Sequence, residues 1–205
     1  MVSLNAWGGQ CWGALEGWIC DINADILCLQ EVIRSPDGAP DWLTYIDPNR
    51  RLQQRPNLFD DVSKRLRDHA AWFSPSAQGP LSDDGGRAYM TQHGLGVWVR
   101  KSLPVTGLHT GFAYGRFRPC GWGSEPVPRA LQFVRVWEPQ SGCEIVIGHF
   151  HGIRHPAGKG DLPERQEQTE TVSAQLQIFR DPTLPCILAG DFNILPDNMF
   201  FAEME

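Results

Sequence analysis

A short polar motif, Gly190-Asp191-Phe192-Asn193, directly follows the apolar run Pro185-Cys186-Ile187-Leu188. Residues two apart on an extended chain point the same way, so the side chains of Asp191 and Asn193 are expected at one rim of a sheet. A carboxylate only accepts hydrogen bonds, whereas a carboxamide both donates and accepts them. This pair suits the activation of a water molecule beside a phosphate. A capped turn, which both residue types favour, is the alternative interpretation.

A second carboxylate, Glu31, stands at the end of another apolar run, Asp25-Ile26-Leu27-Cys28-Leu29-Gln30. A carboxylate at the end of a buried strand is costly unless it reaches the rim of the sheet or binds a cation. A hard oxygen ligand at such a rim suits Mg²⁺, which takes one or two protein carboxylates together with waters and phosphate oxygens. A solvated glutamate at the strand end is the alternative interpretation.

Two histidines lie two residues apart in Gly148-His149-Phe150-His151-Gly152. His149 and His151 share one face of a predicted strand, and Phe150 faces the other side. A histidine at a strand end near acidic residues suits phosphate binding or proton transfer. A hydrogen-bonded core histidine is the alternative for His149. The pair also raises the possibility of a zinc site, with His155 as a third ligand if the following loop folds back.

Asn5 lies on the first predicted strand, just before Trp7-Gly8-Gly9. Its amide is able to bind a phosphate oxygen or a metal-bound water. Asn5 therefore joins Glu31, His151, Asp191 and Asn193 as a candidate site residue.

Apolar periodicity indicates the elements that must position these side chains. Strands are predicted over residues 2–7, 25–32, 94–100, 131–137, 143–150 and 185–190, and helices over 13–23, 57–72 and 161–180. Asp161 is the expected N-cap of the last helix. The segments 74–91 and 107–129 are rich in residues typical of turns and are predicted to be loops. These elements indicate one α/β domain over residues 1–205.

The composition narrows the classes of function. With 205 residues, the chain is long enough for one domain with a substantial core. A net charge of −6 argues mildly against a high-affinity, nonspecific DNA binder. The six cysteines have no Cys-x-x-Cys spacing, which favours free thiols over disulfides. Neither a long apolar segment nor a signal-peptide pattern occurs, so a cytoplasmic protein without a transmembrane segment is predicted.

The ordered motifs resemble the endonuclease/exonuclease/phosphatase superfamily, which has the DNase I-like fold, and a bacterial subgroup in particular. The resemblance covers nearly the whole chain. It rests on Ser3-Leu4-Asn5-Ala6-Trp7-Gly8, on Gln30-Glu31 after its strand, on Gly96-Val97-Trp98-Val99-Arg100, on His149-Phe150-His151-Gly152 with the following segment 158–168, and on Gly190-Asp191-Phe192-Asn193. The resemblance implies two β-sheets packed as a sandwich and flanked by helices, in four α/β/β/α layers.

The resemblance also implies roles for individual residues in a phosphodiester or phosphomonoester hydrolase. Glu31 would bind Mg²⁺ (or Mn²⁺), and Asn5 would help to hold the metal or the phosphate. His151 would contact the scissile phosphate, Asp191 would orient or deprotonate the attacking water, and Asn193 would position phosphate or water beside it. His149 and Arg165 would contribute to substrate binding. The implied substrate is a phosphate ester: a nucleic acid, a phospholipid head group or a small phosphoester.

The sequence departs from the family pattern at three points. His149 stands where the family usually has an asparagine, and no acidic partner for His151 is evident before Gly94. The family pattern also continues to a later Ser-Asp-His motif, whereas this sequence ends at Glu205. We therefore expect a C-terminally incomplete member that lacks the last strands, with weak or absent activity in this chain.

Two other functions stay open at this point. One is a non-catalytic member of the same fold that binds phosphate or a partner. The other is an unrelated α/β domain that binds zinc through His149, His151 and His155. The aromatic residues Phe112, Tyr114, Phe117 and Trp122 are able to stack on bases, contact lipid or pack on the core, and packing is the expected outcome.

Overall fold

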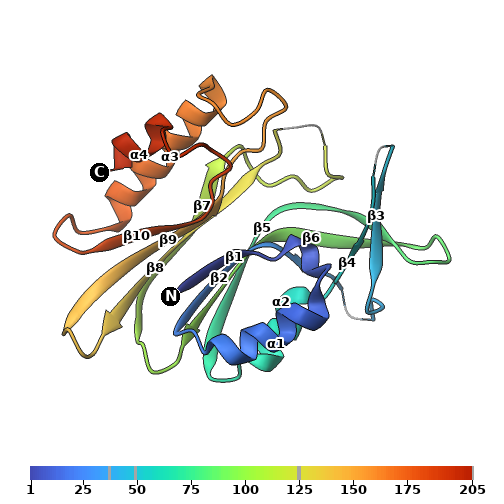
Figure 1. Ribbon diagram of the computed structural model, residues 1–205, viewed down its shortest axis with the longest axis horizontal. Helices are drawn as coiled ribbons and strands as arrows, with labels where there is room; N and C mark the ends of the chain where they lie inside the picture. Colours follow the sequence, from blue (N-terminus) through green and yellow to red (C-terminus); the bar gives the residue numbers. More distant parts are fainter. Residues whose placement is uncertain (37, 49, 124–125, 205) are drawn as a thin grey trace.

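The protein folds into two β-sheets that lie face to face, with a pair of helices on the outer face of each sheet (Figure 1). The computed structural model describes residues 1–36, 38–48, 50–123 and 126–204. The strands of the first sheet are, in spatial order, β1 (Val2–Asn5), β2 (Ile26–Arg34), β6 (Ala88–Arg100), β5 (His69–Ser82), β3 (Leu43–Asp47) and β4 (Arg50–Gln54). Those of the second sheet are β10 (Cys186–Asp191), β9 (Cys143–His151), β8 (Arg129–Glu138) and β7 (Val105–Tyr114).

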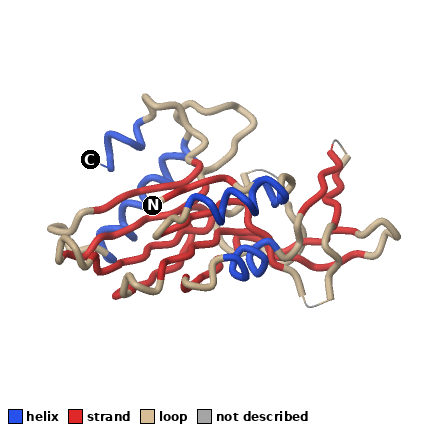
Figure 2. The backbone as a smooth tube through the Cα atoms, turned by 60° about the horizontal axis from the view of Figure 1, so that its bottom comes forward, coloured by secondary structure: helices blue, strands red, loops and turns tan. Residues whose placement is uncertain are grey.

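Both sheets are mixed. The strand pairs β1–β2 and β9–β10 are parallel, and the remaining pairs, such as β2–β6 and β8–β9, are antiparallel. The two layers of strands and the outer helices confirm the expected sandwich flanked by helices (Figure 2).

Alternating side chains divide most of the core into three apolar layers, and a smaller fourth cluster surrounds Ile33, Leu43 and Leu81. Along β2, Ile26 and Cys28 face the second sheet, and Leu27 and Leu29 face the helices, because successive residues of a strand point to opposite faces. The layer between the sheets consists of short aliphatic residues: Ile26, Cys28, Val97, Val99, Val134, Val136 and Ile147. This alternation also fixes which polar residues point into the space between the sheets.

The helices cover the outer faces. Next to the first sheet lie η1 (Trp7–Gly9), α1 (Trp12–Ile22) and α2 (Leu58–Arg65), and next to the second lie α3 (Pro163–Phe179) and α4 (Met199–Met204). The N-cap of α3 is Leu162, and no side chain caps this helix, so the prediction for Asp161 was wrong. Asp161 instead accepts a hydrogen bond from the Asn198 side chain, which ties the start of α3 to the segment before α4.

Several strands lie where the sequence predicted other structure. The predicted helix 57–72 ends at Arg65, and β5 occupies residues 69–82, much of the predicted loop 74–91. Likewise, β7 occupies the first part of the predicted loop 107–129. Both predictions were wrong because they rested on the turn-forming residues of these segments. Long antiparallel pairing of β5 with β6 and of β7 with β8 satisfies the backbone hydrogen bonds there. A register shift between Pro75 and Ala77 accommodates the proline. The hairpin β3–β4 was also missed.

All six cysteines are free, as predicted, with Cys28 buried and Cys143 and Cys186 half-buried on their strands. Among the residues that the structure describes, no helix is long and apolar enough to span a membrane.

Candidate functional site

Most of the candidate residues lie together where three strands, β1, β9 and β10, end beside β2. On β9, Ile147 faces the first sheet, so His149 and His151, two and four residues later, face it too. Asp191 pairs in register with His151, and Asn5 pairs with Gln30. The inner face of each strand therefore changes from apolar to polar toward one end of the sandwich.

Glu31 reaches this site because β2 is irregular there. The predicted strand end was wrong, since β2 continues to Arg34, and a register shift against β6 falls between Leu29 and Val32. Glu31 has a φ of +54°, a left-handed conformation that is uncommon for a non-glycine residue. Such a bulge re-aims a side chain. It directs Glu31 toward the site rather than toward the helix layer.

Left-handed backbone is concentrated at this site. Of the four described non-glycine residues with positive φ, three belong to it or adjoin it: Trp7 (+49°), Glu31 and Asn193 (+55°). Each such residue costs roughly 1–3 kcal/mol and persists only where its surroundings impose it.

Asn5 joins the two carboxylates. Its Nδ2 donates to Glu31 Oε1 and to Asp191 Oδ2, each at 3.1 Å, and its Oδ1 accepts from the Trp7 backbone N–H at 2.9 Å. The Trp7 bond fixes the orientation of the amide, because only oxygen accepts a hydrogen bond. Asn5 therefore presents its nitrogen, not its oxygen, to the carboxylates. In this orientation the amide nitrogen links the two carboxylates, and the part of Asn5 in holding a metal or phosphate stays a prediction.

Asn193 binds both Asp191 and His151, but not through the strand periodicity that the sequence suggested. The strand ends at Asp191, and a turn through Asn193 returns its backbone N–H to Asp191 Oδ1 at 3.2 Å. The Asn193 Nδ2 lies 2.9 Å from His151 Nε2 and 3.3 Å from the Gly152 carbonyl oxygen. The turn thus fixes the carboxylate and the imidazole relative to each other.

His151 is 7% exposed and is flanked by donors. Besides the Asn193 amide, Arg129 Nη1 lies 3.5 Å from Nδ1. A neutral imidazole has one nitrogen with a lone pair in the ring plane, which accepts a hydrogen bond. The Asn193 contact to Nε2 is the shorter of the two, so we assign the lone pair to Nε2. Burial, followed by the positive charge of Arg129, holds the pKa of His151 well below its usual value. His151 is therefore neutral at pH 7, with Nε2 lying 3.8 Å from Asp191 Oδ2.

His149 lies in the core rather than at the site surface. It is 1% exposed, and its Nδ1 donates to Gln132 Oε1 at 3.1 Å while its Nε2 accepts from Gln30 Nε2 at 2.7 Å. The Nε2 of Gln132 donates to Ser74 and to the Trp72 carbonyl, so its Oε1 faces His149. Because this oxygen only accepts, the proton of the His149 ring lies on Nδ1. Burial lowers the pKa of His149 to about 3. Both ring nitrogens are occupied, so the predicted contact between His149 and substrate is wrong, and the core alternative is correct.

Arg165 is also turned away from the site. It is 2% exposed, and its guanidinium donates to the backbone carbonyls of Gly158 (at 2.6 Å) and Gly160 and reaches that of Ile153 at 3.5 Å. These bonds tie the loop after β9 to the first turn of α3. The predicted substrate-binding role is not supported by this geometry, because the donors are used within the protein.

A cavity of about 330 Å³ opens beside these residues. Its lining includes three cationic or titratable residues that the sequence analysis missed, His93, Arg129 and Arg154. No motif marks them: His93 lies within β6, Arg129 begins β8, and Arg154 follows β9. Arg129 and Arg154 share a position near a strand end, whereas His93 lies in the middle of its strand. Burial lowers the pKa of His93, the Glu31 carboxylate opposes this, and Arg129 reinforces it.

The donor chemistry of the cavity fits a divalent cation held by Glu31 and Asp191. Their carboxylates converge on one amide, and Mg²⁺ commonly uses one or two carboxylates with waters and phosphate oxygens. Within the described ranges, no group of three or more His, Cys, Asp or Glu side chains is placed to hold a metal. His149, His151 and His155 are therefore not brought together, which argues against the zinc hypothesis.

Comparison with known proteins agrees with the fold and with the motifs. The model of a family described as Endonuclease/Exonuclease/phosphatase matches residues 2–205. A search of curated proteins finds no significant match.

Three solved structures illustrate the likeness of the fold. A family protein from Bacteroides thetaiotaomicron has a TM-score of 0.62 at 14% identity, covering 96% of this chain and 60% of that one. A mannosyl-6-phosphatase from the same organism has a TM-score of 0.60 at 14% identity, covering 96% and 61%. D. rerio TDP2 with a single-strand DNA product has a TM-score of 0.55 at 19% identity, covering 98% and 62%. The chain thus spans about three fifths of the length of each of these structures.

Proposed function

Because the chain belongs to the endonuclease/exonuclease/phosphatase family, we propose that it hydrolyses phosphate esters by attack of water in the cavity beside Glu31, His151 and Asp191. The observation that carries this proposal is the Asn5 amide, which holds the Glu31 and Asp191 carboxylates together at the strand ends. The similarity to a structure named as a mannosyl-6-phosphatase supports phosphatase chemistry.

Asp191 is suited to accept a proton from the attacking water. Its carboxylate is 36% exposed and is held by the Asn5 side chain and the Asn193 backbone. These two donors fix one direction for the carboxylate, and a positioned base of this kind typically contributes about 10²–10⁴-fold to the rate. The remaining lone pairs of the carboxylate are available to orient the water.

The cationic residues of the cavity are suited to bind the phosphate. The guanidinium groups of Arg129 and Arg154 provide donors whose geometry matches phosphate oxygens. His151 is neutral in the free site, but the negative charge of a phosphate beside Nε2 favours its protonation. The ring would then donate to the phosphate, which is the role that the family resemblance implies.

Glu31 and Asp191 would hold a divalent cation, Mg²⁺ or Mn²⁺, and this cation would neutralise charge on the phosphate when bound. The Asn5 amide donates to both carboxylates and thereby fixes their directions. A small phosphoester fits the 330 Å³ cavity and the acidic chain better than a long polyanion does.

The test is the hydrolysis of p-nitrophenyl phosphate and bis(p-nitrophenyl) phosphate by the 205-residue chain, with Mg²⁺, with Mn²⁺ and with EDTA. We expect weak, cation-dependent turnover that Asp191→Asn lowers by about 10²–10⁴-fold. Glu31→Gln is expected to raise the Mg²⁺ concentration that is needed. Asp21→Asn, at an exposed position on α1, is the matched control and is expected to change nothing.

Turnover that survives EDTA, or that falls equally in Asp191→Asn and Asp21→Asn, would contradict the proposal. Binding of inorganic phosphate without turnover of either ester would favour the non-catalytic alternative.

A further inference from the structure

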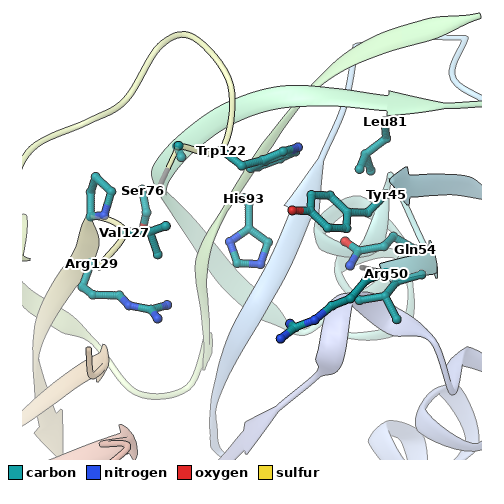
Figure 3. Close-up of a pocket in the computed structure, with 13 residues that line it drawn as sticks. Tyr45, Arg50, Gln54, Ser76, Leu81, His93, Trp122, Val127 and Arg129 are labelled. Carbon is teal, nitrogen blue, oxygen red and sulfur yellow. The ribbon is translucent and has the colours of Figure 1, made fainter. Parts of the chain in front are cut away.

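A second cavity, of about 190 Å³, adjoins the candidate site. The two cavities share His93, Val127 and Arg129 as lining residues, so a ligand bound beside His151 is able to extend into the second cavity. Figure 3 shows this cavity with His93 at its centre. Neither the proposed chemistry nor the sequence motifs assign it a role.

The cavity is built from parts that the site itself does not use. Its far wall is the hairpin β3–β4, with Tyr45, Arg50 and Gln54, which extends from the edge of the first sheet (Figure 1). Its roof is Trp122, from the segment that follows β7. A hairpin and a connecting segment therefore form this cavity, and binding residues are often carried by such segments.

Trp122 is fixed in place by the protein. Its Nε1 donates to the Pro80 carbonyl at 3.2 Å, and its own carbonyl accepts from Arg118 Nη1. The indole lies directly on Gly79, where a Cβ atom would come within 2.5 Å of the indole Cε2. Glycine at position 79 therefore permits the ring to lie against β5. A ring held in this way loses little entropy when a ligand stacks on it.

Three rings surround the cavity. Trp122 meets Tyr45 with ring centroids 6.1 Å apart at 69°, and it meets His93 at 6.1 Å and 82°. Edge-to-face contacts of this kind hold the rings without stacking them flat on one another. The 190 Å³ space against them is about the volume of six water molecules, which suffices for one or two fused rings.

Two arginine side chains line this cavity. In Figure 3, Arg129 and Arg50 point inward from opposite sides of His93. This charge favours a ring that is attached to an anionic group rather than a neutral aromatic compound. Arg129 also lines the candidate site, so the phosphate of such a ligand would lie between the two cavities.

We propose that this cavity receives the organic group of the substrate, and that this group is an aromatic ring carried close to the phosphate. The proposal rests on the phosphoester hydrolysis proposed above and names its substrate class, an aryl or heteroaryl phosphoester. Trp122 and Tyr45 provide the ring faces, and Gly79 sets the position of Trp122. These residues determine specificity and take no part in the attack of water.

The test compares two ligands that the protein does not hydrolyse, phenylphosphonate and methylphosphonate, by isothermal titration calorimetry in the presence of Mg²⁺. The wild-type chain is expected to bind phenylphosphonate about 3- to 10-fold more tightly, as one aromatic contact supplies. Trp122→Ala and Gly79→Ala are each expected to remove this preference, the second by displacing the indole rather than deleting it. Trp137→Ala is the matched control, because Trp137 lies near the opposite end of β8 from Arg129. Circular dichroism checks that each variant is folded.

The proposal is overturned if the wild-type chain binds both phosphonates equally, or if the preference survives in both Trp122→Ala and Gly79→Ala. Its failure is distinguishable from that of the proposed function. Asp191-dependent hydrolysis without a ring preference would refute only the aromatic subsite, whereas a Trp122-dependent preference without any hydrolysis would refute only the catalysis.

Discussion

Replacing Asn5 with alanine tests the arrangement on which the proposed chemistry depends. The substitution deletes the amide that donates to both Glu31 and Asp191, and it leaves two carboxylates facing each other. It also frees the Trp7 backbone N–H, which lies at an exposed position. The expected result is a less stable protein in the absence of divalent cations.

The magnitude follows from the geometry of the two bonds. A hydrogen bond to a charged group contributes about 1.5–3 kcal/mol when it is well formed. Both distances here are 3.1 Å, and the Asp191 side chain is 36% exposed, so about 1 kcal/mol for each bond is the appropriate value. Repulsion between the carboxylates adds to this loss. The total of about 2–3 kcal/mol corresponds to a decrease of roughly 5–10 °C in Tm for a chain of this length.

The assay is a double-mutant cycle in urea at pH 7 with EDTA. It compares the unfolding free energies of the wild type, Asn5→Ala, Glu31→Gln and the double variant. We expect a coupling energy of about 1 kcal/mol between Asn5 and Glu31. Asp21→Asn in place of Glu31→Gln gives a control cycle, which is expected to be additive. Added Mg²⁺ should narrow the difference between wild type and Asn5→Ala, because a bound cation offsets the repulsion between the two carboxylates.

A coupling energy below about 0.3 kcal/mol would refute the reasoning, since it would place Asn5 and Glu31 among independent residues. An unchanged Tm in Asn5→Ala would do so as well.

Two further predictions concern the core histidine and the glycines. Burial places the pKa of His149 far below its unfolded value, so the wild-type protein loses stability as the pH falls below about 6.5. In urea unfolding, the stability advantage of wild type over His149→Gln should shrink by about 1–2 kcal/mol between pH 6.5 and pH 5. A difference that does not change with pH would contradict this prediction. Gly152→Ala would place a Cβ atom 2.0 Å from the Phe192 carbonyl oxygen and should lower the stability of the protein by about 2–4 kcal/mol. Gly17→Ala, in the open middle of α1, should raise the stability by up to about 1 kcal/mol. Thermal unfolding of both variants distinguishes the two effects.

The sequence allowed the location of the site to be predicted because alternation carries that information. On β9 the inward-facing residues change from apolar at Ile147 to polar at His149 and His151. Asn5 and Asp191 likewise end their own strands, and the structure brings them together with His151. The elements alone indicated one α/β domain, and the four-layer arrangement was implied by the family resemblance.

The remaining parts of the site depend on tertiary context. The bulge at Glu31 requires left-handed backbone that glutamate does not favour, so local pattern could not reveal it. Asparagine tolerates this conformation, but a Gly-Asp-Phe-Asn segment alone does not show whether the strand continues through Asn193 or turns there. The role of His149 depends on Gln30 and Gln132, which come from distant strands. Strands rich in Gly and Pro, such as β5, were missed because pairing outweighed propensity.

The positive φ angles at Trp7, Glu31 and Asn193 have a consequence for protein engineering. Glycine adopts this conformation without steric cost, so glycine at these positions would relieve strain while it deletes a side chain that the site uses or adjoins. A directed-evolution campaign that selects only for thermostability would therefore favour changes that damage function at these three positions. Keeping them constant, and directing stabilising changes to exposed helix positions instead, separates the two goals.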